Sequence, residues 1–377
     1  GILGTVLGAS GFVAALARAV GEAGLSGGGY VAAAFLACAV VSSATGTSFG
    51  TILLCGPVLY PAGAAAQAAP AALMGAILAG ATWGDSMSPL SDTSIASSGT
   101  QRVDLAGTVR RRLAYALPAG LAALAASALL AGTGDATGAA RAVHAATGAA
   151  PLRALWLGVV PVACIALLLT RRHLVEALLA GVALAVALAL ALGVLHPVDV
   201  LRIDAARYAA TGVIVQGMER AVGVSVFTLL LTGLVATLQA TRVLERLVGT
   251  VARRATTPRA AEGWIVAMTS AAVVLTTHSV VAILAVGEMA RRTGAAQGIG
   301  GYRRANLLDL TVCTWPFVLP FFLPTILAAG ATRGAEAVGM PPLSPWAVGV
   351  HNTYAWALVV VVLVAVATGW RRGEAGA

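Results

Sequence analysis

The sequence of 377 residues contains no lysine, and charge of either sign is scarce. All 24 basic residues are arginines, 15 residues are acidic, and charged residues make up 10% of the chain against 59% hydrophobic residues. A soluble domain carries about 25% charged residues to cover its surface. The composition therefore excludes a water-soluble globular domain. Without lysine the chain also cannot hold a Walker-type phosphate loop, because that motif ends in Lys followed by Ser or Thr.

Cysteine is sparse as well, and its four copies stand alone in apolar stretches, at Cys38, Cys55, Cys164 and Cys313. Isolated cysteines without metal-ligand spacing behave as small buried hydrophobic residues. No resident cofactor is therefore predicted. The formal net charge of +9 does not indicate nucleic-acid binding, because the arginines form short clusters between apolar runs rather than one basic stripe with aromatics.

Long uncharged runs dominate what remains. A hydrocarbon core about 30 Å thick needs about 20 residues of helix. The uncharged stretches are residues 1–17, 23–84, 113–134, 154–170, 177–198, 221–241, 263–287, 310–332 and 337–370. The second is long enough for about three crossings, which gives about ten membrane elements. The run at Gly1 lacks a basic start and a cleavage site, so it indicates a truncated helix rather than a signal peptide.

The arginine clusters predict which loops face the cytoplasm. They lie at 110–112, 171–172, 242–259, 291–304 and 371–372. Residues 263–287 lie between two of these clusters, so a single crossing would place one basic loop outside. A re-entrant hairpin that enters and leaves on the cytoplasmic side removes the conflict. Non-helical backbone at membrane depth is allowed only where it lines a cavity, so the tip at Thr277, His278 and Ser279 is a candidate site.

A second copy of this hairpin pattern occurs earlier, at residues 42–56. With an offset of 231 residues, Thr45 aligns with Thr276, Ser48 with Ser279, and Gly56 with Gly287. The arginine distribution places the two hairpins on opposite sides of the membrane. Duplicated units of opposite orientation are typical of secondary transporters, whose sites form from broken helices near the midplane.

These patterns predict an all-α polytopic membrane protein. About eight spanning helices and two re-entrant hairpins or broken helices would form two inverted-topology repeats. The predicted parts are a first repeat over 1–135, connecting membrane helices over 136–220 and a second, inverted repeat over 221–377. The charges at 199–207 predict an amphipathic or partly embedded segment between the halves.

The most polar stretch lies at residues 80–100, where Asp85 and Asp92 flank Pro89. Proline and the surrounding small polar residues favour an unwound segment between two half-helices. Carbonyls, hydroxyls and a carboxylate together suit a hard cation such as Na⁺. Asp85 ends the longest uncharged stretch, and burial lets a proton and a cation compete for it. The candidate ligands besides Asp85 are Thr45, Thr47, Ser48, Ser88, Ser91 and Asp92, with Asp85, Ser88 and Thr47 as the sodium ligands.

Each acid also has a structural interpretation. Asp85 could cap the broken helix, and Asp92 could be an N-cap at the interface. In the second half, Asp309 lies near the position that matches Asp85 and is a candidate ion ligand, or it pairs with Arg303 and Arg304. His278 titrates near neutrality, or it stays neutral with a packing role.

The strings SSATGTSFGT at 42–51 and GDSMSPLSDTS at 84–94 resemble the NhaC-type sodium/proton antiporter family within the ion transporter superfamily. The chain departs from that family at Ser86, where members carry a lysine, and in the run SIAS after Asp92-Thr93. The resemblance covers residues 1 to about 120, with weaker support from RRANLLDLTVCTWPF in the second half. It implies a multi-pass plasma (inner) membrane carrier that exchanges protons for Na⁺, and carriers of this superfamily are often homodimers.

The leading hypothesis is sodium/proton antiport by alternating access, with a proton and Na⁺ competing for Asp85 within the lipid bilayer. The alternative is sodium- or proton-coupled exchange of organic acids or amino acids, held by helix N-termini at the hairpin tips. GTSFG at 46–50 fits the GxSxG pattern of a serine hydrolase, but that pattern has meaning only in a strand–turn–helix elbow. We therefore expect a transporter and not an enzyme.

Overall fold

The computed structural model describes residues 2–132, 151–170, 174–204, 209–219 and 255–372, together with single residues between 222 and 237. These residues are almost entirely helical, which confirms the predicted all-α class. Among them the one sheet is a pair of short antiparallel strands, β1 (Arg202–Asp204) and β2 (Ala209–Thr211). Within the segment 199–207, which we expected to be amphipathic or partly embedded, the single turn α11 (Pro197–Val200) is followed by strand β1, and residues 205–207 lie outside the described residues.

The described residues 2–132 form seven helices. They are α1 (Ile2–Ala9), α2 (Phe12–Glu22), α3 (Gly27–Thr45), α4 (Ser48–Ala62), α5 (Pro70–Met87), α6 (Asp92–Gln101) and α7 (Leu105–Leu130). Their starts follow local sequence rules: the side chains of Ser26 and Asp104 cap α3 and α7, and Pro70 begins α5 where no amide partner is needed. The predicted unwound segment is confirmed, because α5 ends at Met87 and α6 begins at Asp92.

Further helices lie in the middle and in the second half of the described chain. The described middle of the chain holds η1 (Leu152–Gly158), α9 (Val159–Leu169) and α10 (Leu174–Ala191). The second half holds α14 (Pro258–Thr276), α15 (Ser279–Ala296), α16 (Gly301–Val312), η2 (Trp315–Phe317), α17 (Leu323–Ala331), η3 (Glu336–Val338), α18 (Pro345–Val350) and α19 (Thr353–Thr368). Most of 221–254, where the predicted second repeat begins, lies outside the described residues.

Among the described residues, α3 and α7 are each long and apolar enough to cross a membrane, and the pair α1 and α2, bent by 70°, passes the same test jointly. Shorter apolar helices occur at 48–62, 152–167, 175–191 and 353–368. Both arms of the second hairpin, α14 and α15, carry charged residues near their outer ends. With 19 and 18 residues, these arms are each about 28 Å long.

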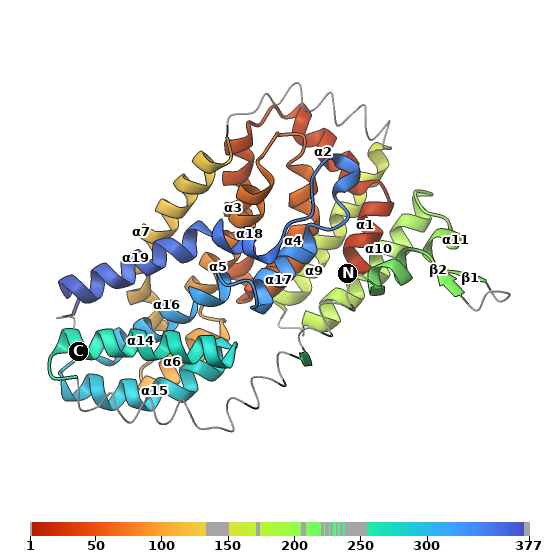
Figure 1. Ribbon diagram of the computed structural model, residues 1–377. Coiled ribbons are helices and arrows are strands. Elements are labelled where there is room, and N and C mark those ends of the chain that lie inside the picture. Colours follow the sequence, from red (N-terminus) through yellow and green to blue (C-terminus); the bar gives the residue numbers. More distant parts are fainter. Residues whose placement is uncertain are drawn as a thin grey trace.

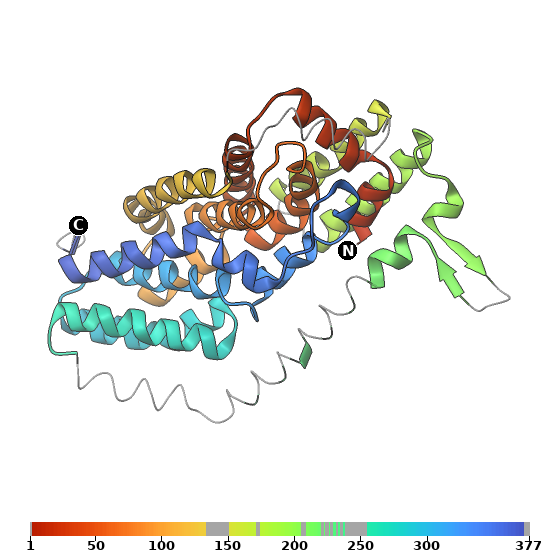
Figure 2. The same cartoon turned by 45° about the horizontal axis from the view of Figure 1, so that its top comes forward.

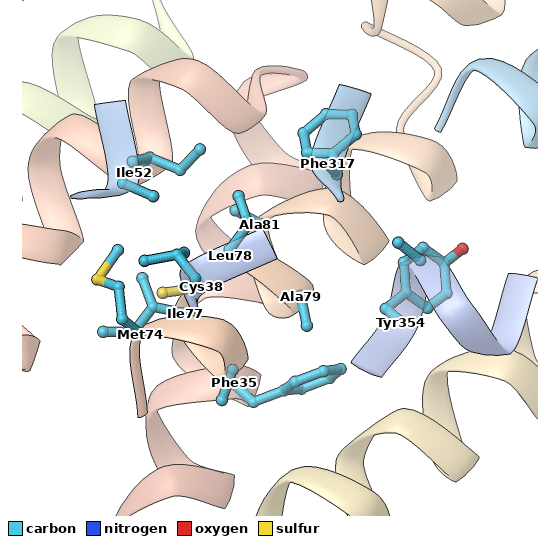
Figure 3. Packing of buried hydrophobic residues seen from close by; sticks show 14 of the residues in the cluster. Phe35, Cys38, Ile52, Met74, Ile77, Leu78, Ala79, Ala81, Phe317 and Tyr354 are labelled. Atoms are coloured by element: carbon cyan, nitrogen blue, oxygen red, sulfur yellow. The ribbon is translucent and has the colours of Figure 1, made fainter. Parts of the chain in front are cut away.

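Helices α14 and α15 lie side by side along one edge, while α11 and the two strands lie at the opposite end of the molecule (Figures 1 and 2). The core lies between them, around α5. Figure 3 shows Phe35 and Cys38 of α3, Ile77 and Leu78 of α5, and Tyr354 of α19 in this core. Because α5 is buried along most of its length, its polar end is also enclosed by protein.

The two helix breaks have the same backbone shape at the predicted offset of 231 residues. Gly46 and Thr277 both adopt the left-handed conformation, with φ of 68° and 52°. The next residues, Thr47 and His278, have φ/ψ of −145°/115° and −138°/119°. Before the breaks, the hydroxyls of Thr45 and Thr276 donate to the carbonyls four residues earlier, at 2.9 and 2.8 Å.

The offset extends to tertiary packing. Helices α5 and α16 begin at residues 70 and 301, and α6 and α17 at residues 92 and 323. Between the halves, Gly56 of α4 packs against Ala331 of α17, and Gly287 of α15 packs against Thr100 of α6. At the offset of 231 residues Gly56 matches Gly287 and Thr100 matches Ala331, so each contact joins the same pair of positions with the two halves exchanged.

Two of the arginine clusters that were predicted to mark cytoplasmic loops contain arginines that lie within helices and are buried. Arg112 lies inside α7 and is completely buried, and Arg303 and Arg304 lie inside α16 with less than a tenth of their surface exposed. Helical periodicity explains the difference, because neighbouring residues of a cluster point to different faces of a helix.

Candidate functional site

The first element of the site is the break between α3 and α4. Gly46 ends α3 in a left-handed conformation, where Cβ of any other residue would also come within 2.6 Å of Leu90. Thr47 then caps α4 by accepting a hydrogen bond from the Gly50 amide at 3.2 Å. Ser48, the first residue of α4, is buried. The break therefore presents a helix N-terminus and a hydroxyl to the protein interior.

Asp85, near the end of α5, faces this helix N-terminus. Its Oδ2 accepts hydrogen bonds from the Ser48 hydroxyl at 2.8 Å and from the Ser48 amide at 3.3 Å. Its Oδ1 is buried and accepts no hydrogen bond from any residue that the structure describes. Asp85 thus makes the capping contact that its structural interpretation predicts. It also keeps one carboxylate oxygen available for a proton or a cation.

Asp309 on α16 forms the second buried acidic centre. It is completely buried, and its Oδ2 lies 2.5 Å from Nη2 of Arg112, which is also completely buried. Ser97 donates to the same oxygen at 3.1 Å, and Thr93 donates to Oδ1 at 3.1 Å. The thiol of Cys313 adds a weak contact to Oδ1 at 3.6 Å. Asp309 therefore does not pair with Arg303 or Arg304, and both of its oxygens have partners.

Arg112 connects four helices at this point. From α7 its Nη1 donates to the Ser86 carbonyl of α5 at 2.8 Å and to the Ser94 hydroxyl of α6 at 2.7 Å. Its Nε donates to Asn306 of α16 at 3.0 Å. The Ser86 hydroxyl lies 2.7 Å from the hydroxyl of Tyr354 on α19. The guanidinium therefore holds the residue next to Asp85 and the ion pair of Asp309 in one network.

The second break presents fewer contacts. The Ser279 hydroxyl donates to the Val312 carbonyl at 3.4 Å, Thr277 occupies the left-handed position, and His278 is exposed as the N-cap of α15. Among the described hydrogen bonds, none joins these three side chains to Asp85 or Asp309. At the offset of 231 residues, the position that matches Asp85 is Pro316, seven residues after Asp309.

The other predicted ligands sit close to Asp85 in the chain but mainly complete helix ends. Ser88 accepts a hydrogen bond from the Leu90 amide at 3.1 Å, and Ser91 pairs with Thr93 at 3.0 Å. Asp92 is the exposed first residue of α6. In the described hydrogen bonds, neither Thr47 nor Ser88 contacts Asp85. The structure thus joins Ser48 to Asp85 directly, places the Ser91 hydroxyl close to the Asp85 carboxylate, and links Ser91 to Asp309 through Thr93.

Arg112, Ser94 and Ser97 were not predicted from the sequence as residues of the site. The signal for Arg112 was its spacing, because Thr108, Arg112, Tyr115 and Ala119 recur at the helical period and all face the interior. Ser94 and Ser97 belong to the serine-rich run of α6, which has one buried face. Their partners depend on tertiary packing: Ser94 contacts Arg112 of α7, and Ser97 contacts Asp309 of α16, more than 200 residues away in the chain.

A second buried cluster lies at the start of α14. Glu262 is completely buried and accepts from Arg303 at 3.0 and 3.2 Å and from Arg372 at 3.1 and 2.7 Å. Arg303 also donates to the Tyr115 hydroxyl at 2.6 Å. This cluster ties the ends of α7, α14, α16 and α19 together. It contains no contact with Asp85 or Asp309 among the described residues.

Residues 46–50 do not form a nucleophile elbow. They lie at a helix–helix break, whereas the hydrolase pattern requires a strand–turn–helix. The Ser48 hydroxyl donates to Asp85, and His278 lies at the other break, 230 residues further along the chain. The arrangement favours ion binding over nucleophilic catalysis.

Residues 2–133 of the chain match the Na⁺/H⁺ antiporter family. The NhaC Na⁺/H⁺ antiporter of Alkalihalophilus pseudofirmus is 39% identical over 89 residues. A malate-2H⁺/Na⁺-lactate antiporter of Bacillus subtilis is 37% identical over 90 residues, and an uncharacterized Na⁺/H⁺ antiporter of Haemophilus influenzae is 42% identical over 89 residues.

Each matched segment covers 24% of this chain and 19% of the relative's length. The predicted resemblance is confirmed for residues 2–133, which carry Ser48, Asp85 and Arg112. The match and the apolar helices indicate a membrane protein whose residues 2–133 are similar to the Na⁺/H⁺ antiporter family.

Proposed function

We propose that this protein is a sodium/proton antiporter of the plasma (inner) membrane and that Asp85 carries the exchanged ion. The observation that carries the proposal is the half-open carboxylate: Ser48 holds Oδ2, while Oδ1 is buried without a partner among the described residues. A proton on Oδ1 and a sodium ion beside it exclude each other. If only a loaded carrier changes conformation easily, exchange follows without a covalent energy source.

The surroundings of Asp85 suit a hard monovalent cation. The described groups near its carboxylate include the hydroxyls of Ser48 and Ser91, and the unwound segment at 88–91 follows it in the chain. Such oxygen ligands favour Na⁺ over softer metals. The additional ligands Thr47, Ser88 and Ser91 would have to turn from the helix ends that they now complete. The second break, at Thr277, His278 and Ser279, would line the path from the other side.

The alternative is exchange of organic acids together with Na⁺ or protons. It is favoured by the relative from Bacillus subtilis, whose name describes a malate-2H⁺/Na⁺-lactate antiporter. A carboxylate substrate needs a positive partner, and the guanidinium of Arg112, the buried cation beside Asp85, is already paired with Asp309. This pairing favours a cation as the substrate.

We further propose that the two halves are inverted repeats that move by alternating access. The equal backbone shapes of the two breaks and the exchanged contacts Gly56–Ala331 and Thr100–Gly287 support a twofold relation between the halves. Broken helices at such a repeat interface are typical of secondary transporters. A homodimer is a further expectation from the family resemblance.

The test is dissipation of a pH gradient in proteoliposomes on addition of Na⁺, Li⁺, K⁺, malate or lactate. We expect proton movement with Na⁺ in the wild type and its loss in Asp85→Asn. The matched control is Glu288→Gln, which removes an exposed carboxylate paired with Arg291 and Arg292 on α15 and should retain exchange. A response to malate or lactate alone would replace sodium/proton exchange by the alternative. Full activity of Asp85→Asn would assign Asp85 to helix capping only.

A further inference from the structure

The two buried acids of the site differ in how completely their oxygens are occupied. Asp309 has contacts on both oxygens, from Arg112 and Ser97 on one and from Thr93 and Cys313 on the other. Asp85 has Ser48 on one oxygen and no described partner on the other. A transported ion therefore has an open position at Asp85 and none at Asp309.

The Arg112–Asp309 pair would be costly to open. Both side chains are completely buried, and separating a buried ion pair is strongly unfavourable because it leaves uncompensated charges. The other donors of Arg112 are engaged by Ser86, Ser94 and Asn306. A sodium ion that displaced Arg112 would have to break these hydrogen bonds as well.

The buried charges of the site add up to one net negative charge. Asp85 and Asp309 contribute two buried carboxylates, and Arg112 contributes one buried cation. The other titratable side chains that face the pair are the thiol of Cys313 and the phenol of Tyr354, both neutral at physiological pH. Asp92 and His278 are exposed and lie outside this buried set. One proton or one monovalent cation neutralises what remains.

We propose that Arg112–Asp309 is a fixed charge pair that stays closed throughout the cycle, so that the protein exchanges one proton for one monovalent cation and moves no net charge. The inference rests on the proposed sodium/proton exchange and deepens it, because it sets the stoichiometry. Arg112 is then a positioning residue: it holds Asp309 ionised and keeps it out of the exchange.

Voltage separates this stoichiometry from the alternatives. A net movement of one charge per cycle would change the equilibrium Na⁺ ratio about 50-fold for a potential of about 100 mV. One-for-one exchange has a balance point that does not depend on potential: a tenfold Na⁺ ratio balances a difference of about one pH unit.

The experiment uses wild-type proteoliposomes with the potential clamped by K⁺ and valinomycin. Na⁺ and protons are both about tenfold more concentrated on the same side of the membrane, so that the two gradients oppose each other in exchange. We expect no net proton flux at about 0 mV or about −100 mV, although exchange proceeds when either gradient is removed. A net flux that follows the imposed potential overturns the inference but leaves sodium/proton exchange standing. If no cation moves protons under any gradient, the proposed function fails, and the inference fails with it.

Variants test the role of the pair itself. In Arg112→Gln, Asp309 loses its counter-charge and can bind a proton, so we expect the balance point to become voltage-dependent. In the double variant Arg112→Gln with Asp309→Asn, the net charge is that of the wild type, and we expect a voltage-independent balance. The double variant decides the matter if the single variant does not fold, since a voltage-dependent balance there contradicts the inference. Glu288→Gln is the control, because Glu288 is exposed on α15 and pairs with Arg291 and Arg292, and it should retain the wild-type balance.

Discussion

Ser48 holds Asp85 with two donors at once, its hydroxyl at 2.8 Å and its backbone amide at 3.3 Å. The two residues belong to α4 and α5, so the contact closes the first turn of α4 with a carboxylate from another helix. A negative charge at a helix N-terminus is favourable because unpaired amides and the helix dipole point toward it. The same contact that stabilises the helix break therefore also stabilises the ionised form of the proposed exchange group.

Removal of the hydroxyl tests this double role. In Ser48→Ala, one donor to the ionised carboxylate is lost, which costs about 1.5–3 kcal/mol for a hydrogen bond to a charged group. Because the loss weakens only the ionised form, the pH of half-maximal exchange should rise by about one unit or more. The measurement is Na⁺-dependent proton flux as a function of pH. Ser10→Ala is the control, since its buried hydroxyl donates to the Leu7 carbonyl at 2.9 Å outside the site, and an equal shift there would argue against a specific role for Ser48.

The exchanged glycine contacts predict tight packing between the halves. A Cβ on Gly287 would lie 2.6 Å from Cβ of Thr100, and a Cβ on Gly56 would lie 2.8 Å from Cβ of Ala331. Gly287→Ala and Gly56→Ala should each destabilise the protein by about 1–3 kcal/mol, because the helices must separate. Thermal unfolding in detergent measures the effect. Gly263→Ala is the control, because no heavy atom lies within 4 Å of a Cβ there, and it should be neutral or stabilising.

The Glu262 cluster predicts a large loss of stability on neutralisation. Glu262→Gln leaves Arg303 without its buried partner, and breaking such a pair costs about 3–5 kcal/mol. Thermal unfolding of the variant should show a clearly lower midpoint than the wild type. The matched control is Glu288→Gln on α15, because Glu288 also contacts two arginines, Arg291 and Arg292, but in an exposed position. Equal effects of the two substitutions would contradict the importance of burial.

The Asp104–Tyr302 contact makes the stability of the protein depend on pH, because it lowers the pKa of Asp104. The hydrogen bonds from the Tyr302 hydroxyl and the Gly107 amide lower the pKa of Asp104. A carboxyl whose folded pKa is lowered contributes stability above its unfolded pKa of about 3.9, and this contribution is lost as the pH falls through the folded value. Tyr302→Phe should therefore reduce stability at neutral pH, with a difference from the wild type that shrinks below about pH 4.

Unfolding midpoints in detergent between neutral and acidic pH measure this difference. Asp104→Asn keeps an N-cap that can accept from the Gly107 amide but removes the charge. Its stability should therefore vary less with pH over the same range than that of the wild type. A difference between Tyr302→Phe and wild type that persists unchanged into acid would show that the contact does not depend on the charge of Asp104.

The elements nearest to the proposed chemistry were predictable from local signals. Pro89 and its polar neighbours predicted the unwound segment between α5 and α6, and the Thr and Ser residues around Gly46 predicted the break between α3 and α4. Both features depend on backbone conformations that nearby residues favour, so the sequence alone contains the information. The burial of Arg112, Arg303 and Arg304 within their clusters could not be predicted in this way. A count of charges does not say which member of a cluster lies on the buried face of a helix.

The sequence by itself determined the class of the protein, because a chain with 10% charged residues and long uncharged runs has to bury its surface in lipid or in itself. It also determined the positions of the two breaks. Only the tertiary structure decided which partner each buried acid has: Ser48 for Asp85, and Arg112 rather than Arg303 or Arg304 for Asp309. The reason is physical, because a buried charge is stabilised by whichever opposite charge the packing of helices brings within contact, and Arg112 comes from a helix almost 200 residues away.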